Sequence, residues 1–332
     1  MRLALCLLLA SSVALADETT TLRIGTIVPE GTGWARGLHE MERDLDAETH
    51  GALKLKFYMG GIAGDEVEML QRVHRGQLDA IMSGSVACET TAPSMRVVRI
   101  PGVFQTWPET SYVLGRLRPL FEDEAKKNGF TYLGEAIVGP SILFSRTPIR
   151  DLSDLSHQRL WIWDIDRMLG ATLAEMHLPV MQLPIRDALR AYEEGRTDGF
   201  IAPAVVALAF QWSAAAHYFT DLRLGFVVGC LVVANRAFDA LPLSSQQALR
   251  VVSAHTKSRI EEIGRMQEDQ LLHGLFAKQG LKPVATDESV RVAFFEDARA
   301  AREKSATRLV SGSLIARVLG MLADFRSEHR VP

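Results

Sequence analysis

Two short motifs of carboxylate and histidine side chains could support metal chemistry. Asp164 and Asp166 are separated by one residue, and paired carboxylates suit hard divalent cations. Both aspartates also precede a helical pattern, where a carboxylate can cap the first turn, and we favour this capping role. His39-Glu40 matches the start of a zinc-protease helix, but Arg43 stands where the second histidine is needed. We therefore expect no metal site.

Glycines and serines after expected strands are the other candidates for chemistry. Gly31-Thr32-Gly33 with Gly37 follows an apolar strand, as in dinucleotide-binding folds. In the dinucleotide-binding pattern G-x-G-x-x-G the third glycine would fall at residue 36, one residue before Gly37, and no acidic residue ends the second strand here. Ser83-Gly84-Ser85 lacks the glycine spacing of a nucleophile elbow. We therefore expect a protein without cofactors that is not an enzyme, with a periplasmic enzyme on a two-lobed fold as the weaker alternative.

The elements that must position these residues follow one pattern twice. Alternating or branched apolar residues predict strands over residues 22–28, 53–59, 80–83, 160–163, 180–183 and from 200. Helical spacing predicts helices over residues 34–49, 65–75, 166–176 and 187–194. In each half a helix ends at a glycine, and an aspartate three residues later precedes a buried strand, as at Gly76 and Asp79. This order predicts two lobes, each with parallel strands covered by helices.

Two long segments are expected to connect the halves. Residues 219–234 form a long apolar segment, and residues 243–275 fit one long helix. Both exceed what one small lobe requires, so we expect them to pass between the lobes. Ligand sites favour clefts between domains.

The N-terminus and the composition limit the location and the partners. Arg2, the apolar run over residues 3–9 and the small residues Ala14 and Ala16 predict a secretory signal peptide at residues 1–16. The mature chain is therefore expected in the periplasm. The net charge is −3 without a basic stripe, which argues against a nucleic-acid partner.

Two cysteines, Cys88 and Cys230, remain after removal of the signal peptide. They could pair in an oxidising compartment. Two separately buried thiols fit the sequence equally well, and both interpretations stay open.

A series of short motifs extends in order along nearly the whole mature chain. They are Leu22-Arg23-Ile24-Gly25, Gly64-Asp65-Glu66, Gly76-Gln77-Leu78-Asp79-Ala80, Ile100-Pro101-Gly102-Val103-Phe104, Asp151-Leu152-Ser153-Asp154-Leu155 and Asn235-Arg236-Ala237-Phe238. This series resembles the DctP family, the solute-binding subunits of tripartite ATP-independent periplasmic (TRAP) transporters.

The resemblance implies an α/β, two-lobed periplasmic binding protein fold, type II-like, with crossing strands and a long bracing helix between the lobes. Lobe I would comprise residues 17–138 plus about 228–255. Lobe II would comprise residues 139–227 plus about 256–332. Hinge closure around a ligand and integral-membrane TRAP transporter subunits as partners are also implied.

The chain departs from that family where an organic-acid carboxylate is expected to bind. Trp161 matches the place of an arginine, Pro140 matches a second arginine, and Ala202 matches an asparagine. None of these side chains replaces the bidentate fork of arginine. A subset of the family is similar at Trp161, Trp163 and Gln211-Trp212. For that subset the resemblance implies apolar ligands and, in some members, a helical-repeat periplasmic accessory subunit.

We therefore expect the cleft between the lobes to bind a small apolar or amphipathic ligand. The tryptophans could instead be core residues, but the resemblance favours a pocket. The candidate ligand-binding residues are Trp34, Glu66, Ser83, Phe104, Pro140, Trp161, Trp163, Ile185, Ala202 and Trp212. Alternatively, an organic carboxylate could bind through Arg99 or Arg146.

Overall fold

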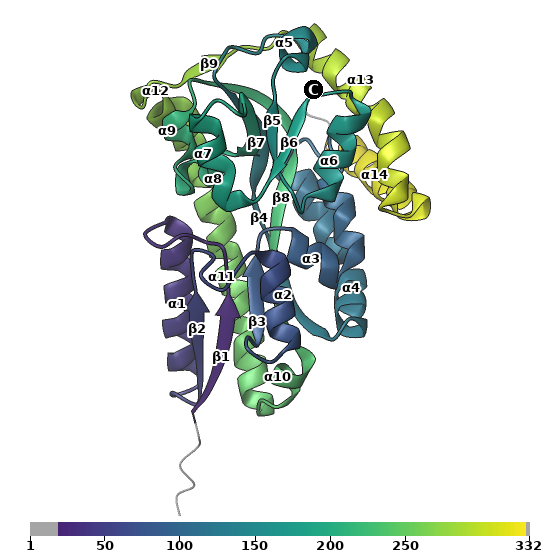
Figure 1. The fold of residues 1–332 in the computed structure, drawn as a ribbon. Coiled ribbons are helices and arrows are strands. Elements are labelled where there is room, and N and C mark those ends of the chain that lie inside the picture. The colour runs from purple at the N-terminus through teal and green to yellow at the C-terminus, as the bar shows by residue number, and fades with distance from the viewer. Residues whose placement is uncertain (1–18, 330–332) are drawn as a thin grey trace, which may run out of the picture.

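The structure, a computed structural model, describes residues 19–329. The signal peptide predicted at residues 1–16 lies outside this range. Within it, one mixed sheet of nine strands extends through two lobes, in the order β2-β1-β3-β8-β4-β7-β5-β6, with β9 beside β8. Figure 1 shows the two lobes one above the other, each with helices beside its strands. The expected α/β, two-lobed fold is confirmed.

The first lobe is built around three parallel strands. They are β1 (Thr20–Gly25), β2 (Leu53–Tyr58) and β3 (Ala80–Ser83). Its helices are α1 (Gly33–Glu48), α2 (Glu66–His74), α3 (Val86–Thr91), η1 (Pro93–Arg99) and α4 (Trp107–Lys127). The predicted start of α2 is confirmed by a capping box, in which Asp65 Oδ1 accepts the Glu68 N–H at 2.8 Å and Glu68 Oε2 accepts the Asp65 N–H at 2.9 Å.

The second lobe repeats this plan. Its strands are β5 (Leu160–Trp163), β6 (Val180–Leu183) and β7 (Gly199–Pro203), with β5 parallel to both others. Its helices are α5 (Leu152–Ser156), α6 (Arg167–Glu175), η2 (Ile185–Asp187), α7 (Ala188–Glu193), α8 (Ala204–Ala209) and α9 (Trp212–Ala215).

The two lobes share a hydrogen-bonding motif between an arginine, an aspartate and a glycine carbonyl. In the first lobe, the Arg23 guanidinium donates to Asp79 at 2.8 Å and to the carbonyl of Gly76 at 2.7 Å. In the second, the Arg159 guanidinium donates to Asp198 at 2.9 Å and to the carbonyl of Gly195 at 2.6 Å. The same contacts in both lobes support one common plan.

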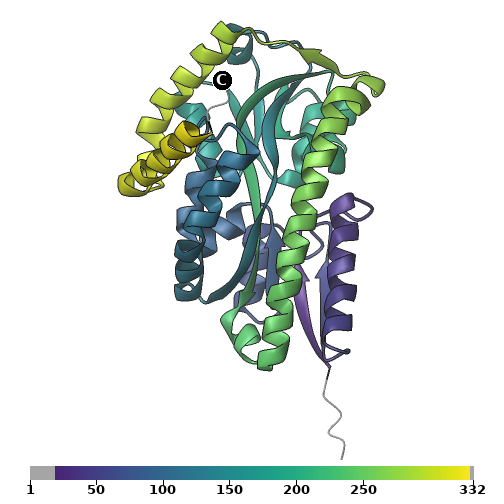
Figure 2. The same cartoon turned by 180° about the vertical axis from the view of Figure 1, so that it is seen from behind.

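Two long antiparallel strands and one long helix connect the lobes. The strands are β4 (Phe130–Ser145) and β8 (Tyr218–Ala234). After α10 (Asn235–Asp239), α11 (Leu243–Gln270) continues into a π-helical turn, η3 (Leu271–Leu275), and α12 (Phe276–Lys278). Figure 2 shows α11 extending along both lobes. The expected crossing strands and bracing helix are therefore present.

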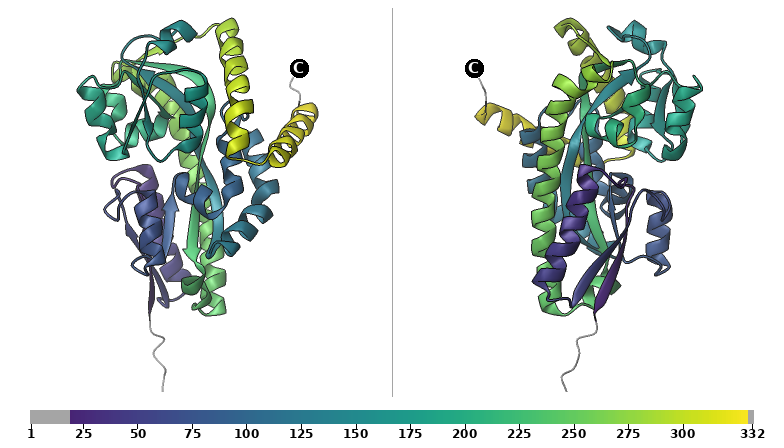
Figure 3. Two further views of the ribbon diagram at one scale, coloured as in Figure 1. Left: turned by 45° about the vertical axis from the view of Figure 1, so that its right-hand side comes forward. Right: turned by 90° about the vertical axis from the view of Figure 1, so that its left-hand side faces the viewer.

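The C-terminal part returns to both lobes. After β9 (Lys282–Val284), α13 (Glu288–Ser305) packs against α6. Following the short turn η4 (Ala306–Arg308), α14 (Gly312–Glu328) contacts α4 of the first lobe, where Arg326 pairs with Glu109 at 2.7 Å. The left view of Figure 3 shows both helices beside the two lobes. The predicted assignment of residues 256–332 to the second lobe stays a prediction, and α14 contacts the first lobe.

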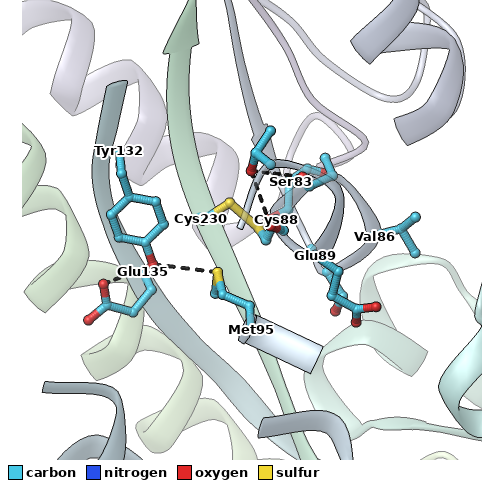
Figure 4. The surroundings of a disulfide bond; sticks show 12 residues. Ser83, Val86, Cys88, Glu89, Met95, Tyr132, Glu135 and Cys230 are labelled. Atoms are coloured by element: carbon cyan, nitrogen blue, oxygen red, sulfur yellow. Dashed lines mark hydrogen bonds between the residues drawn. A yellow bond between two sulfur atoms is a disulfide. The ribbon is translucent and has the colours of Figure 1, made fainter. Parts of the chain in front are cut away.

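A disulfide joins α3 to the crossing strand β8. Cys88 and Cys230 are bonded, with their Cα atoms 5.8 Å apart, and Figure 4 shows their surroundings. The structure thus resolves the question that the sequence left open. Across residues 19–329, no helix combines the length and the apolar character needed to cross a membrane.

Candidate functional site

A cavity of about 210 Å³ lies where the two lobes meet. The first lobe contributes residues that follow β1, residues of α1 and the turn after β3. The second lobe contributes β5, β7 and α8, while β4, β8 and α11 line the cavity from the connecting region. Its walls therefore belong to elements that are far apart in the sequence.

The structure brings most of the predicted ligand-binding residues together in this cavity. They are Trp34, Ser83, Trp161, Trp163, Ile185, Ala202 and Trp212. In strand β5, Trp161 and Trp163 pack with one core cluster and Ile162 between them with another, although Ile162 also lines the cavity. The rings of Trp161 and Trp212 meet edge to face, with centroids 4.9 Å apart. Ligand binding by these residues stays a prediction.

Three predicted residues do not line the cavity. Phe104 is fully buried in the core of the first lobe. Pro140 lies in β4 between Val138 and Ser141, which line the cavity, but is not itself part of the lining. Glu66 is fully buried, and its carboxylate accepts the backbone N–H groups of Gly84 at 2.9 Å and Ala87 at 2.8 Å. Glu66 therefore holds the turn after Ser83.

An ion pair between the lobes lines one part of the cavity. Arg99 of η1 pairs with Asp166, and with Glu89 at 3.3 Å. Asp166 also accepts the Leu169 N–H at 3.1 Å, which confirms its predicted capping role. Burial opposes the charge of Arg99, but Asp166 and Glu89 raise the pKa of Arg99 above its usual value. Burial raises the pKa of Glu89 to about 7.

Two further titratable residues line the cavity and were missed by the sequence analysis. Glu135 of β4 accepts the Tyr132 hydroxyl at 3.0 Å, as Figure 4 shows, and burial raises the pKa of Glu135. Lys257 of α11 pairs with Glu261 at 3.4 Å. An isolated glutamate within the apolar segment at residues 133–138 was the sequence signal for Glu135.

The second cation proposed for a carboxylate, Arg146, does not contribute to the lining of the cavity. Its guanidinium lies over the ring of Tyr192, 4.2 Å from the ring centroid. Within residues 19–329, no group of three or more His, Cys, Asp or Glu side chains is arranged to hold a metal ion.

The comparisons with known proteins agree with this geometry. The family model described as bacterial extracellular solute-binding protein, family 7 (DctP), matches residues 24–308. The uncharacterized protein YiiZ of Salmonella typhimurium is 21% identical over 228 residues, which are 68% of each chain. The crystal structure of a TRAP periplasmic solute-binding protein from Haemophilus influenzae, with bound L-gulonate, has a TM-score of 0.84 at 15% identity and covers 92% of this chain and 99% of its own. A TRAP protein from Desulfovibrio salexigens, with bound orotic acid, has a TM-score of 0.84 at 16% identity and the same two coverages.

Proposed function

The chain belongs to bacterial extracellular solute-binding protein family 7, the DctP family, and from this premise we propose that it captures a small apolar or amphipathic solute between its lobes for a TRAP-type transporter. Family membership confirms the resemblance drawn from the short motifs. The match to a family of binding proteins supports solute binding rather than catalysis.

The observation that carries the proposed ligand class is the aromatic wall of the cavity. Trp34, Trp161, Trp163 and Trp212 come from both lobes and line the same space. Indole rings provide large apolar areas, and burial of apolar area stabilises a complex by about 25 cal/mol per Å². A solute that contacts both groups of rings therefore favours the closed arrangement of the lobes.

The charges at the cavity support the same ligand class. Arg99 is already compensated by Asp166 and Glu89, and Lys257 is compensated by Glu261. A carboxylate ligand would have to share a cation with its present acidic partner or displace that partner. Sharing brings two carboxylates close together, and displacement leaves a carboxylate of the protein without its cation, which is costly in a buried site.

An organic acid is the second candidate, since the structures from Haemophilus influenzae and Desulfovibrio salexigens hold L-gulonate and orotic acid. In this chain such an acid would bind Arg99 or Lys257, which line the cavity. It would not use Trp161, which by the resemblance stands where that family is expected to have an arginine.

The proposed partners are the integral-membrane subunits of a TRAP transporter and, by resemblance to the tryptophan-containing subset, a helical-repeat periplasmic subunit. The proposed location is the periplasm, reached through the signal peptide at residues 1–16. The family match and the TRAP proteins of the same fold support these proposals.

Compounds that co-purify with the protein test the proposed function. The wild type and the Trp161→Arg variant are purified in parallel, denatured, and the released compounds are identified by mass spectrometry. We expect an apolar or amphipathic compound that is enriched in the wild type, because the variant places a charge against the apolar wall. A hydrophilic organic acid retained equally or better by Trp161→Arg would contradict the proposal.

A further inference from the structure

Three polar groups at the cavity are buried without a hydrogen-bond partner in the described part of the chain. They are Nε1 of Trp34, Nε1 of Trp163 and Oγ of Ser83. All three residues line the cavity. Trp161 differs, because its Nε1 donates to the Leu183 carbonyl at 3.1 Å.

A buried donor without an acceptor loses its hydration and gains nothing in return, so native proteins rarely retain one without a function. Trp34 and Ser83 belong to the first lobe, whereas Trp163 belongs to the second. A ligand with an acceptor at each end would bond to both lobes at once. A hydrocarbon would leave these donors unsatisfied.

The charges restrict the kind of acceptor. The cations that line the cavity within residues 19–329, Arg99 and Lys257, have carboxylate partners, and Glu135 adds a further carboxyl group. An anionic ligand would therefore find acidic neighbours and no uncompensated cation. Neutral carbonyl or ether oxygens accept a hydrogen bond without this repulsion.

The inference rests on the proposed function. We propose that the ligand is a neutral organic molecule with acceptor oxygens at both ends of an apolar body, such as a ketone, an ester or an ether. One oxygen accepts from Trp34 and Ser83, and the other accepts from Trp163. The volume of about 210 Å³ suits a molecule somewhat larger than benzene, which fills a cavity of ~150 Å³.

Calorimetric titration with three probes of equal size tests the ligand class. The probes are 4-methoxyacetophenone, which is neutral with an oxygen at each end, 4-methoxybenzoate, which is an anion, and 1-ethyl-4-isopropylbenzene, which has no acceptor. We expect the protein, freed of co-purified compounds, to bind the ketone about tenfold more tightly than the hydrocarbon, because acceptors at both ends satisfy the donors. We expect a similar preference over 4-methoxybenzoate, because its charge meets the acidic side chains at the cavity.

Three matched variants test whether the preference for the ketone over the hydrocarbon depends on the N–H groups of Trp34 and Trp163. Trp34→Phe and Trp163→Phe remove an N–H group but keep an aromatic ring. Trp161→Phe is the control, because its N–H already bonds to Leu183. We expect the ratio of ketone to hydrocarbon affinity to fall about threefold or more in the first two variants and to stay constant in the control. Loss of ring area weakens both probes together and does not change this ratio.

The other outcomes distinguish a failure of the inference alone from a failure of the proposed function as well. Equal affinities for the ketone and the hydrocarbon overturn the inference and leave apolar capture standing. Tightest binding of 4-methoxybenzoate overturns both and favours the organic-acid candidate. If none of the probes binds, the compound released from the wild type decides, and one without neutral acceptor oxygens at both ends overturns the inference.

Discussion

The titration of Glu89 provides a quantitative test of the charged cluster that links the lobes. Burial raises the pKa of Glu89 from 4.5 to about 7. Arg99 and Arg96 favour its ionised form, while Asp166 and Glu66 oppose it. Since the folded protein holds this proton more tightly than the unfolded chain, Glu89 lowers the stability as pH rises. The cost is absent below pH 4.5 and complete above about pH 7.

The size of this effect follows from the two pKa values. Each pKa unit corresponds to about 1.4 kcal/mol, so a rise from 4.5 to about 7 costs about 3 kcal/mol. Glu109 and Asp198 have lowered pKa values and change the stability in the opposite direction. The difference between the wild type and Glu89→Gln cancels these contributions, because both proteins share them.

The assay is urea denaturation at pH 4.5 and pH 8, followed by tryptophan fluorescence. As pH rises from 4.5 to 8, the unfolding free energy of Glu89→Gln should increase by about 3 kcal/mol relative to that of the wild type. Glu262→Gln is the control, since the side chain of Glu262 is 60% exposed, and its difference from the wild type should stay constant. A difference for Glu89→Gln that is equally constant would refute the buried, proton-binding state of Glu89.

Two further predictions concern stability. Replacing Cys88 and Cys230 with alanine should lower the unfolding free energy by about 5 kcal/mol, because the disulfide closes a loop over a sequence separation of 142; unchanged urea midpoints for the wild type with and without reductant would contradict this. Gly264→Ala should cost about 1–3 kcal/mol, because the new Cβ would lie 2.7 Å from the Val138 carbonyl oxygen where α11 packs on β4. Thermal denaturation measures this loss, and Gly320→Ala is the control, because a Cβ at Gly320 would contact nothing within 4 Å. Equal melting temperatures for the two variants would contradict the prediction.

Short strands were predictable from the sequence, whereas the long crossing strand β4 was not. The bounds predicted for Ala80–Ser83, Leu160–Trp163 and Val180–Leu183 match those in the structure, because compact apolar runs between turn residues have few alternatives. Register shifts and the positive φ angles of Gly134 and Gly139 interrupt β4. Its apolar alternation is therefore irregular, and the sequence analysis did not identify it.

The side-chain directions at the candidate site were predictable from sequence periodicity only where local geometry determines them. The period of a strand places Trp161 and Trp163 on one face, and both line the cavity. No local pattern shows that Glu66 points back to bind Gly84, or that Lys257 in α11 reaches a cavity formed by other elements. These positions depend on how distant segments pack, which sequence periodicity does not encode.

The central claim is that capture depends on apolar burial rather than on a salt bridge. Calorimetry of the compound released from the wild type, at several temperatures and at low and high salt, tests this claim most directly. We predict a clearly negative heat-capacity change on binding and an affinity that salt does not weaken. A heat-capacity change near zero with an affinity that falls as salt rises would contradict it.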